Sequence, residues 1–215
     1  MDLAEIFPPF GLRITCGPLE LRCARETDVP IATRLASRGI YEPGELPFLR
    51  RWAEAAEQEL ALNTAQFYWR TFADFRKDDW HLVFLVSHEG TPVGVQDASA
   101  KDFVHVRSII TGSWLSREFQ GRGIGTLMRQ AICAFGLDEL GADEMISGYM
   151  VGNAASAGVS RKVGYEPNGQ IRGLHPDGDR VRVEQRVRLV PQNFVRPPWP
   201  VKVEGADEFR AFIGL

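Results

Sequence analysis

The sequence has little cysteine and no cysteine pair at a metal-binding or redox spacing. Its three cysteines, Cys16, Cys23 and Cys133, are odd in number, and no CxxC motif occurs. These features exclude a disulfide framework and a zinc knuckle, and they favour reduced thiols in a cytoplasmic protein. We also expect no metal cofactor.

Long apolar runs and a secretory signal are also lacking. No stretch approaches the roughly 18 consecutive apolar residues that a membrane span requires. Residues 1–10 are acidic and contain two prolines, whereas a signal peptide has a basic start and an apolar core. We therefore expect a cytoplasmic protein that has no membrane partner.

The chain has no excess of positive charge. It carries 25 Lys and Arg against 28 Asp and Glu, a formal net charge of −3. Because nucleic-acid binding depends on neutralising phosphates, we expect no nucleic-acid partner. With 44% hydrophobic and 25% charged residues among 215, the composition is typical of a folded chain. We expect one domain over residues 1–215, with a core over residues 12–190 and a C-terminal tail over 191–215.

Alternating apolar and polar residues predict a sheet with several antiparallel hairpins. Predicted strands cover residues 12–14, 19–22, 81–87, 92–98, 108–115, 144–150 and 181–190, and another begins at Tyr165. The first predicted helix is capped by Thr27 or Asp28 and ends at about Ser37. Further helices are predicted over 48–75, with a break near Asn63-Thr64, from residue 121 onward, and over 153–163. Residues 1–11 are predicted to be an irregular arm and 39–47 a loop. This order predicts an α+β (mixed α/β) fold: a mixed, mostly antiparallel, twisted sheet with helices on both faces.

The most informative stretch has three alternating glycines, Gly121, Gly123 and Gly125, directly after a predicted strand. Glycine lets the backbone approach a ligand closely and adopt positive φ. The first N–H groups of a helix are unpaired and carry partial positive charge. The loop is therefore predicted to bind an anion such as a phosphate or pyrophosphate. The following helix has an apolar stripe formed by Ile124, Leu127, Met128, Ala131, Ile132 and Phe135.

Other interpretations of this loop are open when it is taken alone. A P-loop would have a lysine before Thr126, where the chain has Gly125. A Rossmann fingerprint would have GxGxxG spacing inside a parallel βαβ unit, whereas this loop follows predicted antiparallel strands. The glycines could also serve only to let the helix pack close to the sheet.

A second motif follows about 30 residues later and has the pattern Asn153-x-x-Ser156-x-x-Val-x-x-Lys-x-Gly164-Tyr165. Together with QGRGIG at residues 120–125, it resembles the pyrophosphate loop and the cofactor-side helix of the GNAT N-acetyltransferases. The similarity is to the branch of the ribosomal-protein N-terminal acetyltransferases RimJ and RimL. The motifs cover residues 113–168, and the strand order extends the resemblance back to residue 12. Residues 79–80, 94–96, 99–103 and 112–115 also resemble a small actinobacterial subgroup that uses succinyl-CoA.

The resemblance implies a GNAT-type acyl-CoA N-acyltransferase fold in which strands 108–115 and 144–150 splay apart around the pantetheine arm. It implies backbone contacts from Trp114 and Leu115 to that arm. The implied pyrophosphate-binding residues are Gln120, Gly121, Arg122, Gly123, Ile124, Gly125 and Thr126. Candidates for the adenosine 3′-phosphate are Arg117, Arg122, Arg161 and Lys162, each of which could equally be a solvated surface charge.

The second motif implies roles for two polar residues. Asn153 matches an asparagine near the cofactor and is also suited to cap the helix. Ser156 matches a serine that can hydrogen-bond the CoA sulfur, and it is the candidate catalytic general acid; the alternative is a polar contact in the first helical turn. Many family members have a tyrosine acid seven residues after the asparagine, where this chain has Ser160. A tyrosine-acid mechanism is therefore not expected.

The implied reaction is transfer of an acyl group from acetyl-CoA or another acyl-CoA, such as succinyl-CoA, to a primary amine. An α-amine is partly neutral at pH 7 and needs only a weak base, whereas a lysine needs more assistance. Because no cysteine matches an acyl-enzyme position, we expect direct attack in a ternary complex. Candidate bases are Asp97, Asp102, His105 and Glu184, each of which could instead be a surface or structural residue.

The acceptor and the partners are the least determined by the sequence. The acceptor could be a protein N-terminus, a peptide or antibiotic amine, or a metabolite. Aromatic residues between Trp52 and Trp80 could wall its pocket or pack in the core. The tail could form a homodimer or cap a sheet edge. The alternatives to an enzyme are an acyl-CoA-binding module or sensor of the same fold without efficient transfer, and an unrelated nucleotide-binding domain.

Overall fold

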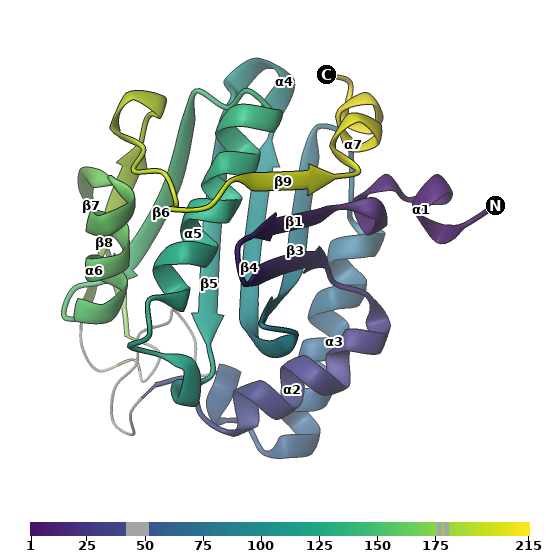
Figure 1. The fold of residues 1–215 in the computed structure, drawn as a ribbon. Helices are drawn as coiled ribbons and strands as arrows, with labels where there is room; N and C mark the ends of the chain where they lie inside the picture. Colours follow the sequence, from purple (N-terminus) through teal and green to yellow (C-terminus); the bar gives the residue numbers. More distant parts are fainter. Residues whose placement is uncertain (42–51, 176–177, 179–180) are drawn as a thin grey trace.

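The computed structural model describes residues 1–41, 52–175, 178 and 181–215. Its centre is a nine-stranded sheet with the order β7-β8-β6-β5-β4-β3-β2-β1-β9 (Figure 1). Neighbouring strands pair antiparallel except β5 and β6, which pair in parallel. The predicted mixed, mostly antiparallel sheet is confirmed.

The strands agree closely with the predicted segments. The bounds of β5 and β6 are those predicted, whereas β3 and β4 extend further at both ends. The strands are β1 (Arg13–Cys16), β2 (Leu19–Cys23), β3 (Asp79–His88), β4 (Thr91–Lys101), β5 (Ser108–Leu115), β6 (Glu144–Met150), β7 (Glu166–Leu174), β8 (Val181–Leu189) and β9 (Val201–Glu204).

Helices cover both faces of the sheet, as predicted: α5 lies on one face, and α2 and α3 lie on the other. The helices are α1 (Leu3–Ile6), α2 (Val29–Ser37), α3 (Glu57–Ala73), α4 (Phe103–Val106), α5 (Ile124–Ala134), α6 (Ala154–Val163) and α7 (Ala206–Ile213). Further helical turns are η1 (Pro8–Gly11), η2 (Glu26–Asp28), η3 (Trp52–Glu54), η4 (Arg117–Phe119), η5 (Phe135–Glu139) and η6 (Pro191–Asn193).

Alternation along β3 explains why both faces are covered. Leu82 and Phe84 are buried in the large core beneath α5, whereas Val83 packs with Tyr68 of α3 and Ala32 of α2. Successive strand residues point to opposite faces, so an uninterrupted apolar run requires cover on both sides.

The N-terminal arm is ordered by aromatic packing. Residues 1–11, predicted to be irregular, form α1 and η1. The ring of Phe7 lies 5.1 Å from that of Phe75 and 6.0 Å from that of Phe212, measured between centroids. Phe10 lies 5.2 Å from Phe72 of α3. These contacts between distant segments fix a stretch whose local sequence gives no periodic pattern.

The C-terminal tail completes the sheet. The tail contains β9 and ends in α7, and it is not separate from the core, because β9 pairs with β1 from Arg13↔Glu204 to Cys16↔Val201. Phe209 and Ile213 of α7 are buried in the core. Both termini therefore lie on the same side of the molecule (Figure 1). Of the two roles considered for the tail, the structure shows the cap on a sheet edge; homodimer formation stays a prediction.

The predicted helix over 48–75 begins outside the described residues, as does most of the predicted loop over 39–47. Within the described part, α3 runs unbroken through Asn63 and Thr64, so the predicted break is wrong. The Thr64 hydroxyl donates to the Leu60 carbonyl at 2.7 Å and so leaves the helix intact. No helix among the described residues is long and apolar enough to span a bilayer.

A buried ion pair replaces the predicted cap at the start of α2. Asp28 does not cap the helix with its side chain; its carboxylate accepts two bonds from Arg22, at 2.7 and 3.0 Å, and one from the backbone N–H of Arg25, at 2.8 Å. The hydrogen bond that Arg22 donates to Asp28 raises the pKa of Arg22. The pair links β2 to η2.

We expect Asp28→Asn to lower the free energy of unfolding by about 3 kcal/mol, because Arg22 would lose the charge that compensates it inside the protein. Urea denaturation followed by circular dichroism measures this value. Glu118→Gln, which breaks the exposed pair between Arg38 and Glu118, is the control and should cost less than about 1 kcal/mol. Equal effects of the two substitutions would contradict a special role for Asp28.

Candidate functional site

The site is organised around a gap between β5 and β6. These strands pair only from Ser108↔Glu144 to Ile110↔Ile146. Beyond that point β5 stays paired with β4 as far as Leu115, and β6 stays paired with β8 as far as Met150. The two strands therefore separate over residues 111–115 and 147–150, as the predicted splaying requires.

Backbone directions along β5 identify the groups that face the gap. The Thr111 carbonyl points toward β6 and accepts from the Ser147 hydroxyl at 2.9 Å. Gly112 points toward β4: its carbonyl accepts from Gln96 at 2.6 Å and its N–H donates to Asp97 at 2.5 Å. Because backbone groups alternate along a strand, Ser113 and Leu115 face the gap and Trp114 faces β4. Of the two residues expected to contact pantetheine, only Leu115 therefore offers its backbone to the gap.

The Trp114 side chain packs against the α2 and α3 layer. Its ring lies 5.7 Å from that of Trp52, between centroids, and it packs against buried residues of the α2 and α3 layer. Trp114 thus joins the sheet to the aromatic segment that was expected to wall the acceptor pocket or to pack in the core. Here it contributes packing.

The glycine loop offers a row of unused backbone donors. Gly121 and Gly123 have φ values of +74° and +83°, which favour glycine. No atom lies within 4 Å of the position that a Cβ would take at either residue. Within the described part of the chain, the backbone N–H groups of residues 121–125 donate to no acceptor. They stand at the positive end of α5, so the arrangement can hold an anion.

The backbone N–H groups at the two ends of the predicted pyrophosphate loop, those of Gln120 and Thr126, already donate hydrogen bonds within the protein. The N–H of Gln120 donates to the Arg117 carbonyl at 3.1 Å, and the N–H of Thr126 donates to the Gly123 carbonyl at 3.1 Å. The Gln120 side chain donates to the carbonyls of Ile40 and Leu115 at 2.8 and 2.9 Å. Gln120 therefore fixes the loop to the end of β5, and the unused donors are those of residues 121–125.

The start of α6 lies beside this loop. Asn153 caps the helix, because its Oδ1 accepts from the Ser156 N–H at 3.0 Å. The Ser156 hydroxyl is half-buried and makes no hydrogen bond within the described residues. A Cβ on Gly125 would stand 3.6 Å from Val159, so α5 and α6 are close here. The capping role of Asn153 is confirmed; its contact with a cofactor and the role of Ser156 stay predictions.

Tyr165, Cys133 and Cys23 have buried side chains. The Tyr165 hydroxyl lies 3.3 Å from Cys133 Sγ and 3.4 Å from Thr111 Oγ1. Burial raises the pKa of Tyr165, and it raises the pKa of Cys133 to about 11 and that of Cys23 to about 12. A protonated, buried thiol is a poor nucleophile. The described residues also contain no group of three side chains able to hold a metal ion.

The four candidate bases lie in two different parts of the structure. Asp102 and His105 lie at α4, at the end of β5 opposite the glycine loop (Figure 1). Asp97 and Glu184 flank the gap: Asp97 bonds to Gly112, and the Glu184 carboxylate lies over Gly148 of β6, where a Cβ would meet it. Glu184 also pairs with Arg186 at 3.0 Å.

One polar residue near Asp97 was not anticipated. Nε2 of His81 lies 3.6 Å from Oδ2 of Asp97, and its ring is 5.5 Å from that of Phe67, between centroids. His81 is the first residue of the apolar run that predicted β3, so it was interpreted only as part of a strand. The sequence signal that could have identified it is a histidine at the end of an apolar strand, on the same face of the sheet as an aspartate of the next strand.

A buried arginine crosses the narrow end of the gap. Arg129 of α5 is 5% exposed. Its guanidinium donates to Ser147 at 2.7 Å and to Ser113 at 2.9 Å, and it lies over the Tyr165 ring. Among the described residues it has no acidic partner, and its Nε has no acceptor. A buried cation without a counter-ion is costly, so this part of the site favours an anion.

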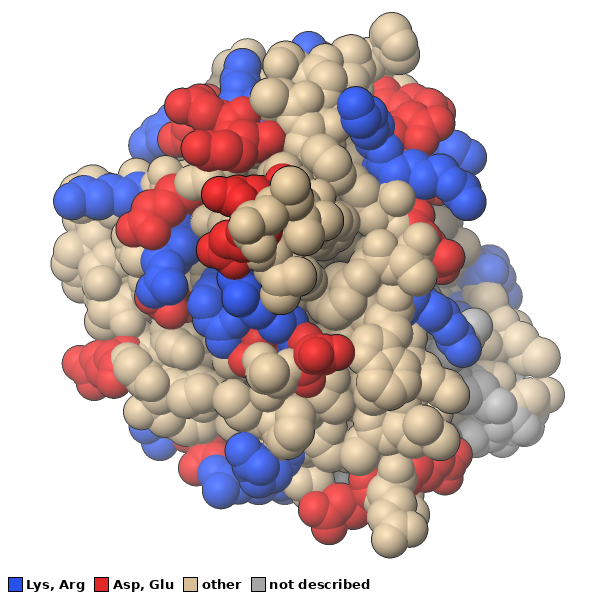
Figure 2. Space-filling model, turned by 90° about the vertical axis from the view of Figure 1, so that its right-hand side faces the viewer, with Lys and Arg blue, Asp and Glu red and all other residues tan. Residues whose placement is uncertain are grey.

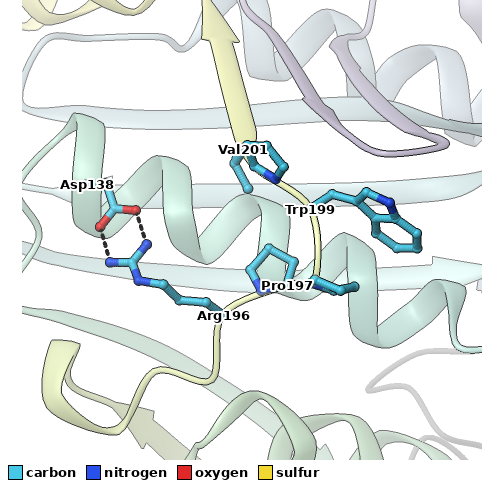
Figure 3. A pocket seen from close by; sticks show the side chains of 7 residues that line it. Asp138, Arg196, Pro197, Trp199 and Val201 are labelled. Atoms are coloured by element: carbon cyan, nitrogen blue, oxygen red, sulfur yellow. Dashed lines mark hydrogen bonds and ion pairs between the residues drawn. The ribbon is translucent and has the colours of Figure 1, made fainter.

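A surface pocket of about 310 Å³ lies elsewhere, along the segment before β9 (Figure 3). Its walls include Arg196 and Asp138, which form two hydrogen bonds at 2.6 and 2.9 Å, and Trp199. None of its residues belongs to the gap or to the glycine loop. Acidic and basic side chains are interspersed on the face in Figure 2, rather than gathered by sign.

Comparison with known proteins agrees with this geometry. The model of the "Acetyltransferase (GNAT) domain" family matches residues 19–166. The candidate ribosomal N-acetyltransferase YdaF of Bacillus subtilis (strain 168) is 27% identical over 110 residues, which are 51% of this chain and 57% of that protein. The chain thus spans just over half the length of this curated relative.

Solved structures share the fold. RimJ of Mycobacterium smegmatis in complex with CoA-disulfide has a TM-score of 0.66 at 21% identity, covering 93% of this chain and 91% of that one. RimL, a ribosomal L7/L12 alpha-N-protein acetyltransferase in complex with coenzyme A, has a TM-score of 0.65 at 20% identity, covering 80% and 94%.

A mostly antiparallel sheet with one parted parallel pair, beside a glycine loop at a helix start, has the architecture of the acyl-CoA N-acyltransferase fold. The chain belongs to the GNAT acetyltransferase family. The predicted family and fold are confirmed, and the predicted enzyme class is confirmed at the level of that family.

Proposed function

We propose that this protein is an N-acyltransferase that moves an acyl group from acyl-CoA to a primary amine by direct attack in a ternary complex. The observation that carries the proposal is the row of unused N–H groups at residues 121–125, beside the gap between β5 and β6. These donors would hold the CoA diphosphate, and the gap would take the pantetheine between Leu115 and β6. The thioester would then face the open side of the sheet.

Mass spectrometry of the purified protein for a co-bound acyl-CoA tests the donor. Release of free CoA, measured when acyl-CoA is mixed with a panel of amines, tests transfer. Competition by CoA but not by NAD or ATP is expected. Binding without release of CoA would favour the alternative, a module or sensor that holds acyl-CoA, and failure to bind CoA would refute the proposal.

The proposal also concerns which acyl group the donor carries. Acetyl-CoA is the simplest donor, but Arg129 lies unpaired at the narrow end of the gap. An acyl group that ends in a carboxylate, as succinyl does, would supply the missing counter-ion. We therefore infer a carboxylated donor such as succinyl-CoA.

The proposed acceptor is the α-amine of a peptide or protein. Ile110 on the central strand β5 is 47% exposed and Ile171 on β7 is 52% exposed. The strand register places both side chains on the face of the sheet opposite α5. Exposed apolar side chains on this face suit an extended chain better than a small polar amine. The amine is also easier to deprotonate than a lysine. A cytoplasmic location and a homodimer belong to the same proposal.

Ser156→Ala tests the role of that serine as general acid. We expect kcat to fall tenfold or more while the CoA dissociation constant changes less than threefold, because the hydroxyl would act on the leaving thiolate and not on the diphosphate. Steady-state kinetics and isothermal titration measure the two quantities. The backbone N–H of residue 156 still reaches Asn153 in the variant, so the helix cap is preserved. An unchanged kcat would remove Ser156 from the mechanism.

A further inference from the structure

His81 and Asp97 form a polar pair on the face of the sheet opposite α5. Asp97 has two distinct contacts: Oδ1 accepts from the Gly112 N–H at 2.5 Å, and Oδ2 lies 3.6 Å from Nε2 of His81. The Phe67 ring packs against the imidazole at an interplanar angle of 75°. The carboxylate that lies beside His81 is therefore itself fixed to β5.

The pair lies close to where β5 and β6 separate. Gly112 is two residues beyond Ile110, the last residue of β5 that pairs with β6. Both side chains are about one-third exposed, at 34% for His81 and 32% for Asp97, so solvent reaches them. The carboxylate therefore stands between the gap and the imidazole.

Glu184 is less suited to the same task. It lies over Gly148 across the gap, but its carboxylate is paired with the Arg186 guanidinium at 3.0 Å. Because the Arg186 guanidinium already engages this carboxylate, it is less available to contact an incoming amine. Histidine, by contrast, exchanges protons near neutral pH.

We propose that His81 is the general base of the proposed transfer and that Asp97 is its positioning residue. The proposal rests on the proposed N-acyltransferase function. The incoming ammonium gives one proton, through water held at Asp97, to the imidazole of His81. The neutral nitrogen then forms a bond to the thioester carbonyl carbon and the carbon–sulfur bond breaks. The Ser156 hydroxyl gives its proton to the thiolate and takes up the second nitrogen proton, so CoA leaves as a thiol, and His81 releases its proton to solvent.

The test compares His81→Ala and Asp97→Asn with His88→Ala, the control on the same strand. The donor is acetyl-CoA or succinyl-CoA, whichever the wild type uses, and the acceptors are a peptide with a free N-terminus and an aromatic amine that is neutral at pH 7. With the peptide, we expect His81→Ala to lower kcat by about 30-fold, and Asp97→Asn by about tenfold. His88→Ala should stay within twofold.

Two readouts separate a base from a merely structural residue. The aromatic amine needs no deprotonation before attack, so His81→Ala should lower its rate by less than threefold. Added imidazole should restore at least part of the peptide activity to His81→Ala. Equal losses with both amines, or an unchanged kcat with the peptide, would overturn the assignment. If the wild type binds CoA but transfers to neither amine, the proposed function fails instead.

Discussion

Gly123→Asp is expected to weaken CoA binding by at least a hundredfold. The carboxylate would stand in the open space at the start of α5, among the N–H groups of residues 121–125 that are proposed to hold the diphosphate. Two unit charges about 4 Å apart repel by about 4 kcal/mol at an effective dielectric constant near 20. Isothermal titration with CoA measures the loss, and thermal unfolding checks that the fold is retained.

Gly123→Asn is the matched control for this prediction. Both Asn and Asp tolerate the positive φ of +83° at this position better than other side chains do. The two variants have nearly the same size and backbone cost, and they differ only in charge. We expect the Asn variant to bind CoA within about tenfold of the wild type. If both variants bind as the wild type does, the diphosphate is held elsewhere; if both lose binding equally, shape rather than charge is responsible.

The sequence predicted the parts of the fold that local patterns determine. The bounds of β5 and β6 and the cap at Asn153 follow from alternation and from a side chain suited to an N-terminus. The sequence left open whether the aromatic residues between Trp52 and Trp80 pack in the core or wall a pocket. In the structure Tyr68 is buried in the core, whereas Phe67 is exposed beside His81. Whether an aromatic ring faces core or solvent depends on what the tertiary structure places over it.

Long-range pairing was beyond local patterns. The four residues of β9 alternate too briefly to identify a strand, and the partner β1 lies at the other end of the chain. The structure of the N-terminal arm also depends on long-range contacts, because Phe7 and Phe10 pack against aromatic rings of distant segments that include α3 and α7. Neither segment carries its own periodic signal, so only the folded arrangement reveals them.

The candidate site shows the same division. The glycine loop and the start of α6 were identified by spacing, and the structure narrows the unused amides to residues 121–125. Arg129 was missed because the helix was defined by its apolar stripe, and an arginine outside the stripe is normally exposed. It is buried instead, because β5, β6 and Tyr165 enclose that side of α5. The role proposed for His81 depends on Asp97, which is distant in the sequence but lies beside His81 on the neighbouring strand β4.

Arg129→Met is expected to reverse the preference for the acyl donor. We expect kcat/KM for succinyl-CoA to fall by about 30- to 100-fold, because the charge-assisted bonds to the terminal carboxylate are lost. The value for acetyl-CoA should change by less than threefold, since acetyl carries no charge. Competition between the two donors, with the products resolved by mass spectrometry, measures the ratio directly.

The stability of the variant separates specificity from structure. Replacing a buried, uncompensated charge with an apolar side chain of similar length is often neutral or stabilising, so Arg129→Met should unfold at a temperature no lower than the wild type. Arg129→Lys keeps the charge but loses the fork that reaches both Ser113 and Ser147. It should therefore retain part of the succinyl preference. Equal losses for both donors, or a wild type that prefers acetyl-CoA, would show that Arg129 holds the two strands rather than reading the acyl group.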